Sequence, residues 1–144
     1  MWFLDGEFLV GALISVVTIA IQALATVVVV RLGRFASKRL APRDRLATLI
    51  IVMCAAGTLL TLAHLMEVAV WAVMYTQLGV TQERDAYYFA FVNFTTLGYG
   101  DLLPEHRWRV LGPMTAANGM LLFGWSTAVL FAVLSRALRM LRLS

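Results

Sequence analysis

The sequence contains little that a soluble catalytic domain would need. Only 14% of its 144 residues are charged and 61% are hydrophobic, far from the composition of an ordinary soluble domain. The single cysteine, Cys54, lies inside an apolar run, which excludes a disulfide framework within the chain and a cysteine-based metal site. The sequence offers no nucleophile–base pair, phosphate loop or metal-ligand cluster. We therefore expect no enzyme, no cofactor and no small-molecule substrate.

Long apolar segments are what the chain does contain. Three of them are long enough to span a membrane at about 20 residues each, and together they occupy most of the sequence. They predict an N-terminal transmembrane helix within residues 1–30, a second at 46–78 and a third at 108–142. Acidic residues and no basic residue precede the first span, unlike a secretory signal, so we expect this helix to be retained. The fold class predicted is an all-α membrane protein.

The charges are distributed unevenly between the two sides of these spans. Nine of the twelve basic residues lie in the connection 31–45 or at the carboxyl end of the third span, where they are Arg136, Arg139 and Arg142. By the positive-inside rule, the N-terminus lies outside and the C-terminus in the cytoplasm. Basic residues beside apolar runs are topology signals, so we expect no nucleic-acid partner; the connection is either such a signal alone or also a surface for anionic lipid. Ala41-Pro42 predicts that no helix continues through this connection.

The outer side carries an excess of acids, which would concentrate cations there. Its six acidic residues are Asp5, Glu7, Glu83, Asp85, Asp101 and Glu105.

The segment between the second and third spans holds the most informative motif. Residues 85–95 have mixed aromatic and apolar character, and they are too few to span a bilayer. They lead into the sequence Thr95-Thr96-Leu97-Gly98-Tyr99-Gly100-Asp101. Bare backbone at bilayer depth is tolerated only where it is buried in protein or lines a cavity. Gly98 and Gly100 can adopt positive φ, which allows a run whose successive carbonyls face one way.

This order of helix, re-entrant helix, Thr-x-Gly-Tyr-Gly-Asp and helix resembles the pore module of the tetrameric potassium-channel family. Residues 46–144 are similar to the small bacterial members with two helices around a pore loop, and the first helix is an addition to that module. The resemblance implies an outer helix at 46–78, a pore helix at 85–95, a selectivity filter at 96–101 and an inner helix at 108–142. It also implies a homotetramer in the lipid of a bacterial plasma membrane.

The same resemblance implies a passive potassium-selective channel. Potassium, the permeant ion, would be bound by the carbonyls of Thr96, Leu97, Gly98 and Tyr99, with the Thr96 hydroxyl completing the innermost ring. The Tyr99 side chain would point outward and brace the filter against the pore helix. Two alternatives stay open: a weakly selective cation channel, or a non-conducting membrane scaffold or accessory subunit that keeps the pore fold.

The support of the filter departs from the family pattern at two positions. Leu97 stands where the filter usually has valine, and leucine lacks the stiffness of a β-branched side chain. Val92 stands where many relatives have a glutamate that pairs with the aspartate after the filter, here Asp101. We expect a hydrogen bond from the Tyr88 hydroxyl to Asp101; the alternative is a tyrosine that faces lipid or the membrane interface.

Two ionisable residues lie inside the second span, where such groups usually indicate function. His64 and Glu67 are spaced i, i+3 and so share one helix face. Three roles are open for this pair. The two side chains either form a polar staple, in which they hydrogen-bond each other or Asn93, or act as a pH-sensitive gate, or serve in metal or proton transfer. Glu67 is also a candidate for the carboxylate that Val92 does not supply.

The third span contains three further candidates. Asn118 either lines the cavity below the filter or makes an interhelical hydrogen bond. Gly119 and Gly124 are either gating hinges or close-packing contacts. The segment Trp125-Ser126-Thr127 indicates no function. The first span lacks the regularly spaced arginines of a voltage sensor, so the sequence does not predict strong voltage gating.

Overall fold

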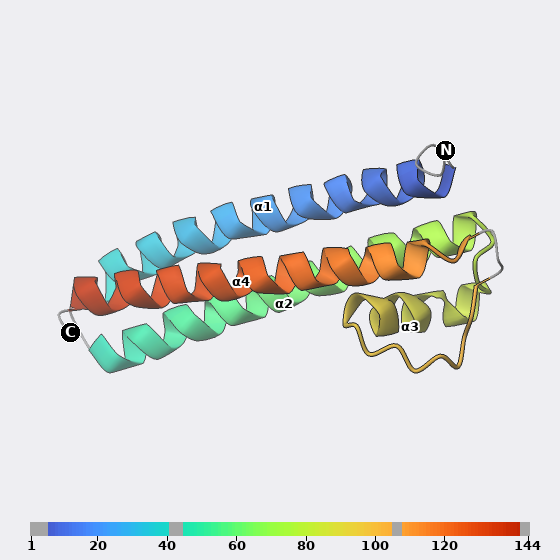
Figure 1. Ribbon diagram of the computed structural model, residues 1–144. Coiled ribbons are helices and arrows are strands. Elements are labelled where there is room, and N and C mark those ends of the chain that lie inside the picture. Colours follow the sequence, from blue (N-terminus) through green and yellow to red (C-terminus); the bar gives the residue numbers. More distant parts are fainter. Residues whose placement is uncertain (1–5, 41–44, 105–107, 142–144) are drawn as a thin grey trace.

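Four α-helices make up the protein. The structure, a computed structural model, describes residues 6–40, 45–104 and 108–141 of the chain. The helices are α1 (Gly6–Leu40), α2 (Arg45–Gln77), α3 (Glu83–Phe94) and α4 (Leu111–Leu141), and these described residues contain no strand. The three long helices run side by side, and the short α3 packs beside one end of α2 and α4 (Figure 1). The predicted all-α class is confirmed.

Each long helix contains a segment apolar enough to cross a membrane. These segments are Gly6–Ala36 in α1, Leu46–Gln77 in α2 and Leu111–Arg139 in α4. Even the shortest has 29 residues, or about 43 Å of helix at 1.5 Å per residue. This exceeds a hydrocarbon core of about 30 Å, so the helices would tilt or project into the head-group region.

The first helix is longer than the sequence predicts. α1 continues to Leu40, so residues 31–40 of the expected basic connection are helical. Arginine, leucine, alanine and lysine are strong helix formers, and basic side chains near a carboxyl terminus interact favourably with the helix dipole. The helix ends before Pro42, which disfavours helical conformation in the residue that precedes it. Ala41-Pro42 itself lies outside the described residues.

The chain reverses after α2 at a glycine. Gly79 has a φ of +66°, its N–H donates to the Thr76 carbonyl over 3.1 Å, and the Val80 N–H donates to the Tyr75 carbonyl over 2.9 Å. This pair of hydrogen bonds around a left-handed residue is a Schellman motif, which satisfies the last carbonyls of a helix. The turn directs the chain into α3 at the same end of the molecule.

Two hydrophobic clusters hold the helices together. At the α3 end, aromatic residues of α2 and α3 pack on one another and on Leu111 of α4; they include Trp71, Tyr75, Phe89 and Phe94. At the other end, α1, α2 and α4 meet through smaller side chains, among them Val29, Val52, Ala56, Val129 and Val133. α3 therefore rests on the aromatic cluster, and the other half of the bundle consists of three helices alone.

α1 also contacts the start of α4 closely. A Cβ on Gly11 would lie 2.5 Å from the Met114 sulfur, so the Met114 side chain would have to shift to admit a larger residue here. The carboxylate of Glu7 accepts a hydrogen bond from the Val110 N–H over 3.3 Å, just before α4 begins. The additional helix is therefore packed onto the rest of the chain along its length.

Candidate functional site

The loop after α3 is positioned by the carboxyl end of that helix. α3 begins with acidic residues in its first turn, Glu83 and Asp85, which suit the positive end of the helix dipole. Its last residue, Phe94, is fully buried, and its ring lies 5.4 Å from that of Phe123 in α4. The carboxyl end of α3, with its partial negative charge, is thereby fixed against the middle of α4.

Hydrogen bonds to the last turn of α3 hold the start of the loop. The Thr96 N–H donates to the Asn93 carbonyl and the Leu97 N–H to the Val92 carbonyl, each over 2.9 Å. The loop then runs back along α3 toward the start of α4 (Figure 1). Its first peptide groups are therefore continuous with a rigid helix end.

The sign of the backbone φ angle alternates along the loop. Thr96, Gly98 and Gly100 have φ values of +61°, +55° and +73°, whereas Leu97 and Tyr99 between them have negative φ. In an ordinary strand, successive carbonyls point to opposite sides of the chain. An alternation of left- and right-handed conformations would instead turn successive N–H groups to one side and the carbonyls to the other. The positive φ predicted for both glycines is present, and Thr96 shares it.

A row of backbone carbonyls is a ligand set for a hard cation. Such oxygens can replace the hydration shell of an alkali ion when several chains supply them around one axis. One chain supplies a single row, so the arrangement is open on its own. The loop residues from Thr96 to Asp101 are exposed in the isolated chain.

The aspartate at the end of the motif is held by a tyrosine of α3. The Tyr88 hydroxyl donates to Asp101 Oδ2 over 2.6 Å, and the Leu102 N–H donates to Asp101 Oδ1 over 3.2 Å. This carboxylate hydrogen bond raises the pKa of the Tyr88 hydroxyl above its ordinary value. The hydrogen bond expected between these two residues is thus present in the structure.

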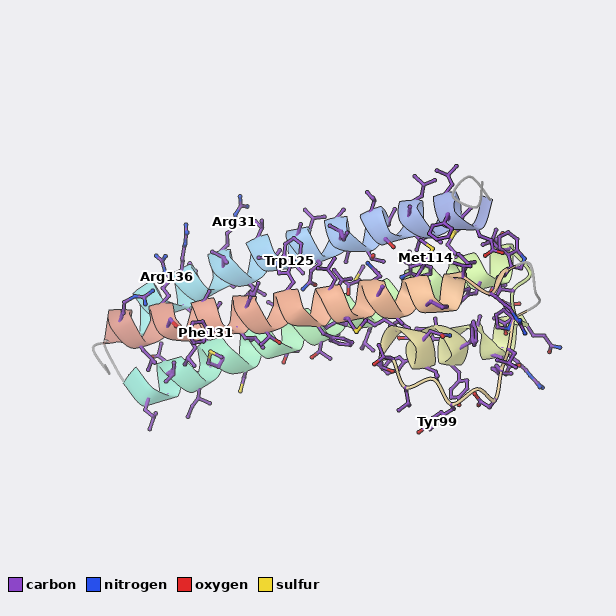
Figure 2. The ribbon with its side chains drawn as sticks, in the orientation of Figure 1. Arg31, Tyr99, Met114, Trp125, Phe131 and Arg136 are labelled. Carbon is purple, nitrogen blue, oxygen red and sulfur yellow. The ribbon has the colours of Figure 1, made fainter. Side chains whose placement is uncertain are left out.

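Tyr99 does not brace the loop within its own chain. Its side chain is 67% exposed, and Figure 2 shows it at the outer edge of the loop, directed away from α3. Leu97 is likewise 55% exposed. The loop thus directs Tyr99 away from α3 of its own chain, and the bracing of the filter against a pore helix stays a prediction.

Val92 and Asn93 support the loop through their positions on α3. The Val92 side chain is buried, and its carbonyl accepts from Leu97. The Asn93 amide donates to the Phe89 carbonyl over 2.8 Å, and its side-chain oxygen would lie 3.1 Å from a Cβ on Gly112. Asn93 thus fills the narrow space between α3 and the first turn of α4.

His64 and Glu67 bind each other and α4. His64 Nδ1 lies 2.8 Å from Glu67 Oε2, and His64 Nε2 lies 2.9 Å from Ser126 Oγ. Ser126 Oγ also accepts a hydrogen bond from Gln22 Nε2 of α1 over 2.7 Å. Glu67 is completely buried. These contacts support the polar staple among the alternatives, but its partners are Ser126 and Gln22 and not Asn93. The pH gate and the metal or proton transfer stay predictions.

The structure does not give Glu67 the role of the missing filter carboxylate. Its contact is with His64 on its own helix, whereas Asp101 is held by Tyr88. The i, i+3 spacing turns the Glu67 side chain back along α2, so His64 engages it first.

Asn118 joins all three long helices. Its side-chain oxygen accepts hydrogen bonds from the Thr18 hydroxyl of α1 over 2.8 Å and from the Trp71 indole N–H of α2 over 3.1 Å. The side chain is nearly buried, because it lies on the face of α4 that meets α1 and α2. These contacts support the interhelical hydrogen bond among the two alternatives, and the lining of a cavity by Asn118 stays a prediction.

The two candidate hinge glycines have different surroundings. A Cβ on Gly119 would lie 1.9 Å from the Phe94 carbonyl oxygen, so this glycine is the point where α4 meets the end of α3. Gly124 has no neighbouring atom within 4 Å of such a Cβ. α4 runs without interruption through both positions. Gly119 is thus a close-packing contact, and a hinge at Gly124 stays a prediction.

Three residues of this polar network were missed in the sequence. Thr18 and Gln22 are completely buried, and Ser126 is nearly so. The available signal was spacing, since Thr18 and Gln22 are one turn apart on a single face of an apolar helix. Ser126 gave no such signal, because its partners come from two other helices.

Comparison with known proteins agrees with this geometry. No curated protein and no solved structure matches the chain. Residues 48–136 match the profile of the ion channel family, which is more than half of the chain and includes most of α2, all of α3, the loop and most of α4. The match includes neither α1 nor the basic end of α4 beyond Arg136. Together with its three membrane-spanning helices, this makes the protein an integral membrane protein of the ion channel family, with a pore module of the two-helix type.

Proposed function

We propose that the protein is a passive, potassium-selective channel whose filter is the segment Thr95–Asp101. The observation that carries the proposal is the alternation of backbone hand at Thr96, Gly98 and Gly100. Such an alternation would align the carbonyls of Thr96, Leu97, Gly98 and Tyr99, which would then replace the water around a potassium ion. The carboxyl end of α3 adds a partial negative charge near the inner end of this row.

The active form in this proposal is a homotetramer. One row of carbonyls cannot surround an ion, so several chains must meet around an axis, and the potassium-channel pores that this chain resembles use four. The exposed side chains of Leu97 and Tyr99 support such an assembly. α4 adds an exposed stripe at helical spacing that faces away from α1 and α2, formed by Ala117, Met120, Gly124 and Phe131.

The proposed orientation places the α3 end outside the cell and the other end in the cytoplasm. Among the described side chains, Glu7, Glu83, Asp85 and Asp101 belong to the α3 end, whereas Arg31, Arg34, Arg136 and Arg139 belong to the other. The positive-inside rule and the attraction of cations to an acidic mouth both favour this orientation. The membrane would be a bacterial plasma membrane, and neither a cofactor nor catalysis is needed.

Ion flux into proteoliposomes tests the proposal. The purified protein is reconstituted, and uptake is measured down gradients of K⁺ and of Na⁺. We expect K⁺ uptake at least tenfold faster than Na⁺ uptake. Gly98→Ala should abolish K⁺ uptake, because alanine at a φ of +55° is strained and would disrupt the carbonyl row. Gly57→Ala, in open space on α2, is the matched control and should conduct like the wild type.

The other outcomes discriminate between the alternatives. Equal K⁺ and Na⁺ uptake would replace the proposal with a weakly selective cation channel, for which Leu97 in the filter is the specific reason. Protein that assembles in the liposomes but transports neither ion would be a membrane scaffold or accessory subunit.

A further inference from the structure

A basic cavity lies at the end of the bundle opposite to α3. It has a volume of about 300 Å³ and is formed between α1 and α4, and Val52 of α2 also lines it. Three arginines line it: Arg34 of α1, and Arg136 and Arg139 of α4. The remaining lining residues are glycine, valine and alanine. The cavity is thus charged at its rim and apolar within.

The three arginines have no acidic partner among the described side chains. The ion pairs found there are His64–Glu67 and Arg84–Asp85, and neither includes Arg34, Arg136 or Arg139. Like charges that line one cavity repel each other, so an anion between them would be stabilised. Guanidinium groups bind phosphate oxygens with paired hydrogen bonds, which makes phosphate a suitable anion.

The apolar part of the cavity continues toward the membrane interior. A second cavity of about 160 Å³ between α1 and α2 shares Gly33 and Val52 with the first. A Cβ on Gly33 would touch only Val52, at 3.9 Å, so helix packing does not require glycine here. The absence of a side chain at this position instead leaves the space open, and Val30 and Val52 form its walls.

The cavity lies at the depth of the lipid head groups. Residues 8–30 and 110–135 contain no charged residue, and the arginines of α1 and α4 follow directly, so they stand where these two helices leave the hydrocarbon. Basic pockets between transmembrane helices bind anionic lipid head groups. We propose that this cavity binds one anionic phospholipid of the leaflet at the basic end, with its phosphate on the three arginines and the start of an acyl chain against Val30 and Val52. This site is formed by the additional helix α1 and does not depend on ion conduction.

Lipid retention by the purified full-length protein tests the site. The protein in a neutral detergent is titrated with dioleoylphosphatidylglycerol or with dioleoylphosphatidylcholine, and bound lipid is measured by native mass spectrometry. We expect the wild type to retain phosphatidylglycerol in preference to phosphatidylcholine. The double variant Arg34→Gln with Arg136→Gln should weaken phosphatidylglycerol binding about 25-fold, at about fivefold for each arginine.

Two further variants separate a cavity from a diffuse basic surface. Arg31→Gln removes the same charge from α1, but Arg31 does not line the cavity and projects from the side of α1 away from α4 (Figure 2). It should change phosphatidylglycerol binding less than about twofold. Gly33→Leu leaves every charge in place and fills the cavity, and it should weaken binding at least fivefold.

Several results would overturn the inference. The first is equal retention of the two lipids by the wild type. The second is an effect of Arg31→Gln as large as that of Arg34→Gln, and the third is normal lipid binding by Gly33→Leu. Displacement of phosphatidylglycerol by inorganic phosphate alone would assign the arginines to a free anion. Loss of oligomer in the arginine variants, without lipid selectivity in the wild type, would mean that another copy of the chain covers the cavity.

Discussion

Thr96 is the residue of the loop whose backbone is most restrained. A φ of +61° is uncommon for a β-branched residue and costs on the order of 1–3 kcal/mol. Such a conformation persists only where its surroundings determine it, and here its own N–H and that of Leu97 are bonded to carbonyls of α3. The strain is thus held by the helix end, at the position where the proposed ion path begins.

At the same scale, Tyr88 and Asp101 tie the end of the motif to α3. Tyr88→Phe removes the 2.6 Å hydrogen bond and should accelerate the decay of K⁺ current during a sustained opening, because Asp101 then has fewer restraints. The neighbouring Tyr87, which donates to the Leu65 carbonyl of α2, provides the matched control as Tyr87→Phe. Single-channel recording in a lipid bilayer measures both. Identical decay in Tyr88→Phe and the wild type would show that the bond has no part in filter stability.

The pH dependence of this contact has a definite sign. The hydrogen bond raises the pKa of Tyr88, so the hydroxyl keeps its proton through the neutral range and loses it only at more alkaline pH than a free tyrosine. Any stabilisation that depends on the tyrosine proton is therefore present in the neutral range and lost as the pH rises through the raised pKa. Current decay governed by this bond should be constant between about pH 5 and 9.

A substitution at Leu97 separates the role of the filter side chain in gating from the role of its carbonyl in ion selectivity. Its carbonyl belongs to the proposed ion path, whereas its side chain is exposed in the single chain. Leu97→Val restores β-branching without changing the backbone, so it should alter open lifetime and leave the K⁺/Na⁺ permeability ratio within about twofold. Lifetime comes from single-channel records, and the ratio from reversal potentials. A large shift of the reversal potential would contradict this assignment.

At the residue scale, a contact could be predicted from the sequence when its two partners lie near each other in the chain. Positive φ at Gly98 and Gly100 could be predicted, because glycine tolerates it and the motif requires it. The bond between Tyr88 and Asp101 could be predicted as one of two alternatives, since both belong to one short helix and its loop. The positive φ of Thr96 could not, because the contacts that impose it are tertiary.

Among the elements, the contact between α3 and α4 determines where the loop begins. Gly119→Ala would place a Cβ 1.9 Å from the Phe94 carbonyl oxygen, so the end of α3 would have to move. We expect K⁺ flux to fall at least tenfold and the free energy of unfolding to fall by about 1–3 kcal/mol. Gly57→Ala on α2, where an added Cβ would meet nothing within 4 Å, should lower neither quantity. Normal flux in Gly119→Ala would show that the position of α3 does not limit conduction.

A second inter-element feature is the polar network that joins α1, α2 and α4. Ser126→Ala would leave His64 Nε2 and Gln22 Nε2 without their shared partner and should lower the free energy of unfolding in micelles by about 1 kcal/mol. Thr127→Ala is the control, because Thr127 is exposed and its hydroxyl bonds the Phe123 carbonyl of its own helix. Denaturant titrations would measure both. Equal stability of the two variants would show that the network does not contribute to the attachment of α1.

At the scale of the whole molecule, the exposed loop and the exposed stripe of α4 require other copies of the chain. We expect native mass spectrometry in mild detergent to give four times the 16.0 kDa of one chain. Tyr99→Ala should reduce the fraction of this species, because Tyr99 is 67% exposed in the single chain and assembly would bury it. Phe8→Ala, on α1 and distant from the loop, should not. A stable monomer that still conducts K⁺ would contradict the tetramer.

The sequence by itself determined the three spans, the short helix, the motif and the uneven charge. These depend on apolar length, glycine and the position of basic residues, which are local properties of the chain. Only the tertiary structure decided that Asn118 bonds Thr18 and Trp71, that His64 reaches Ser126, and that Tyr99 points away from α3. Each of these outcomes depends on which helix face meets which neighbour. Which helix faces meet depends on how the segments pack against one another, and the pattern of residues along one helix does not specify it.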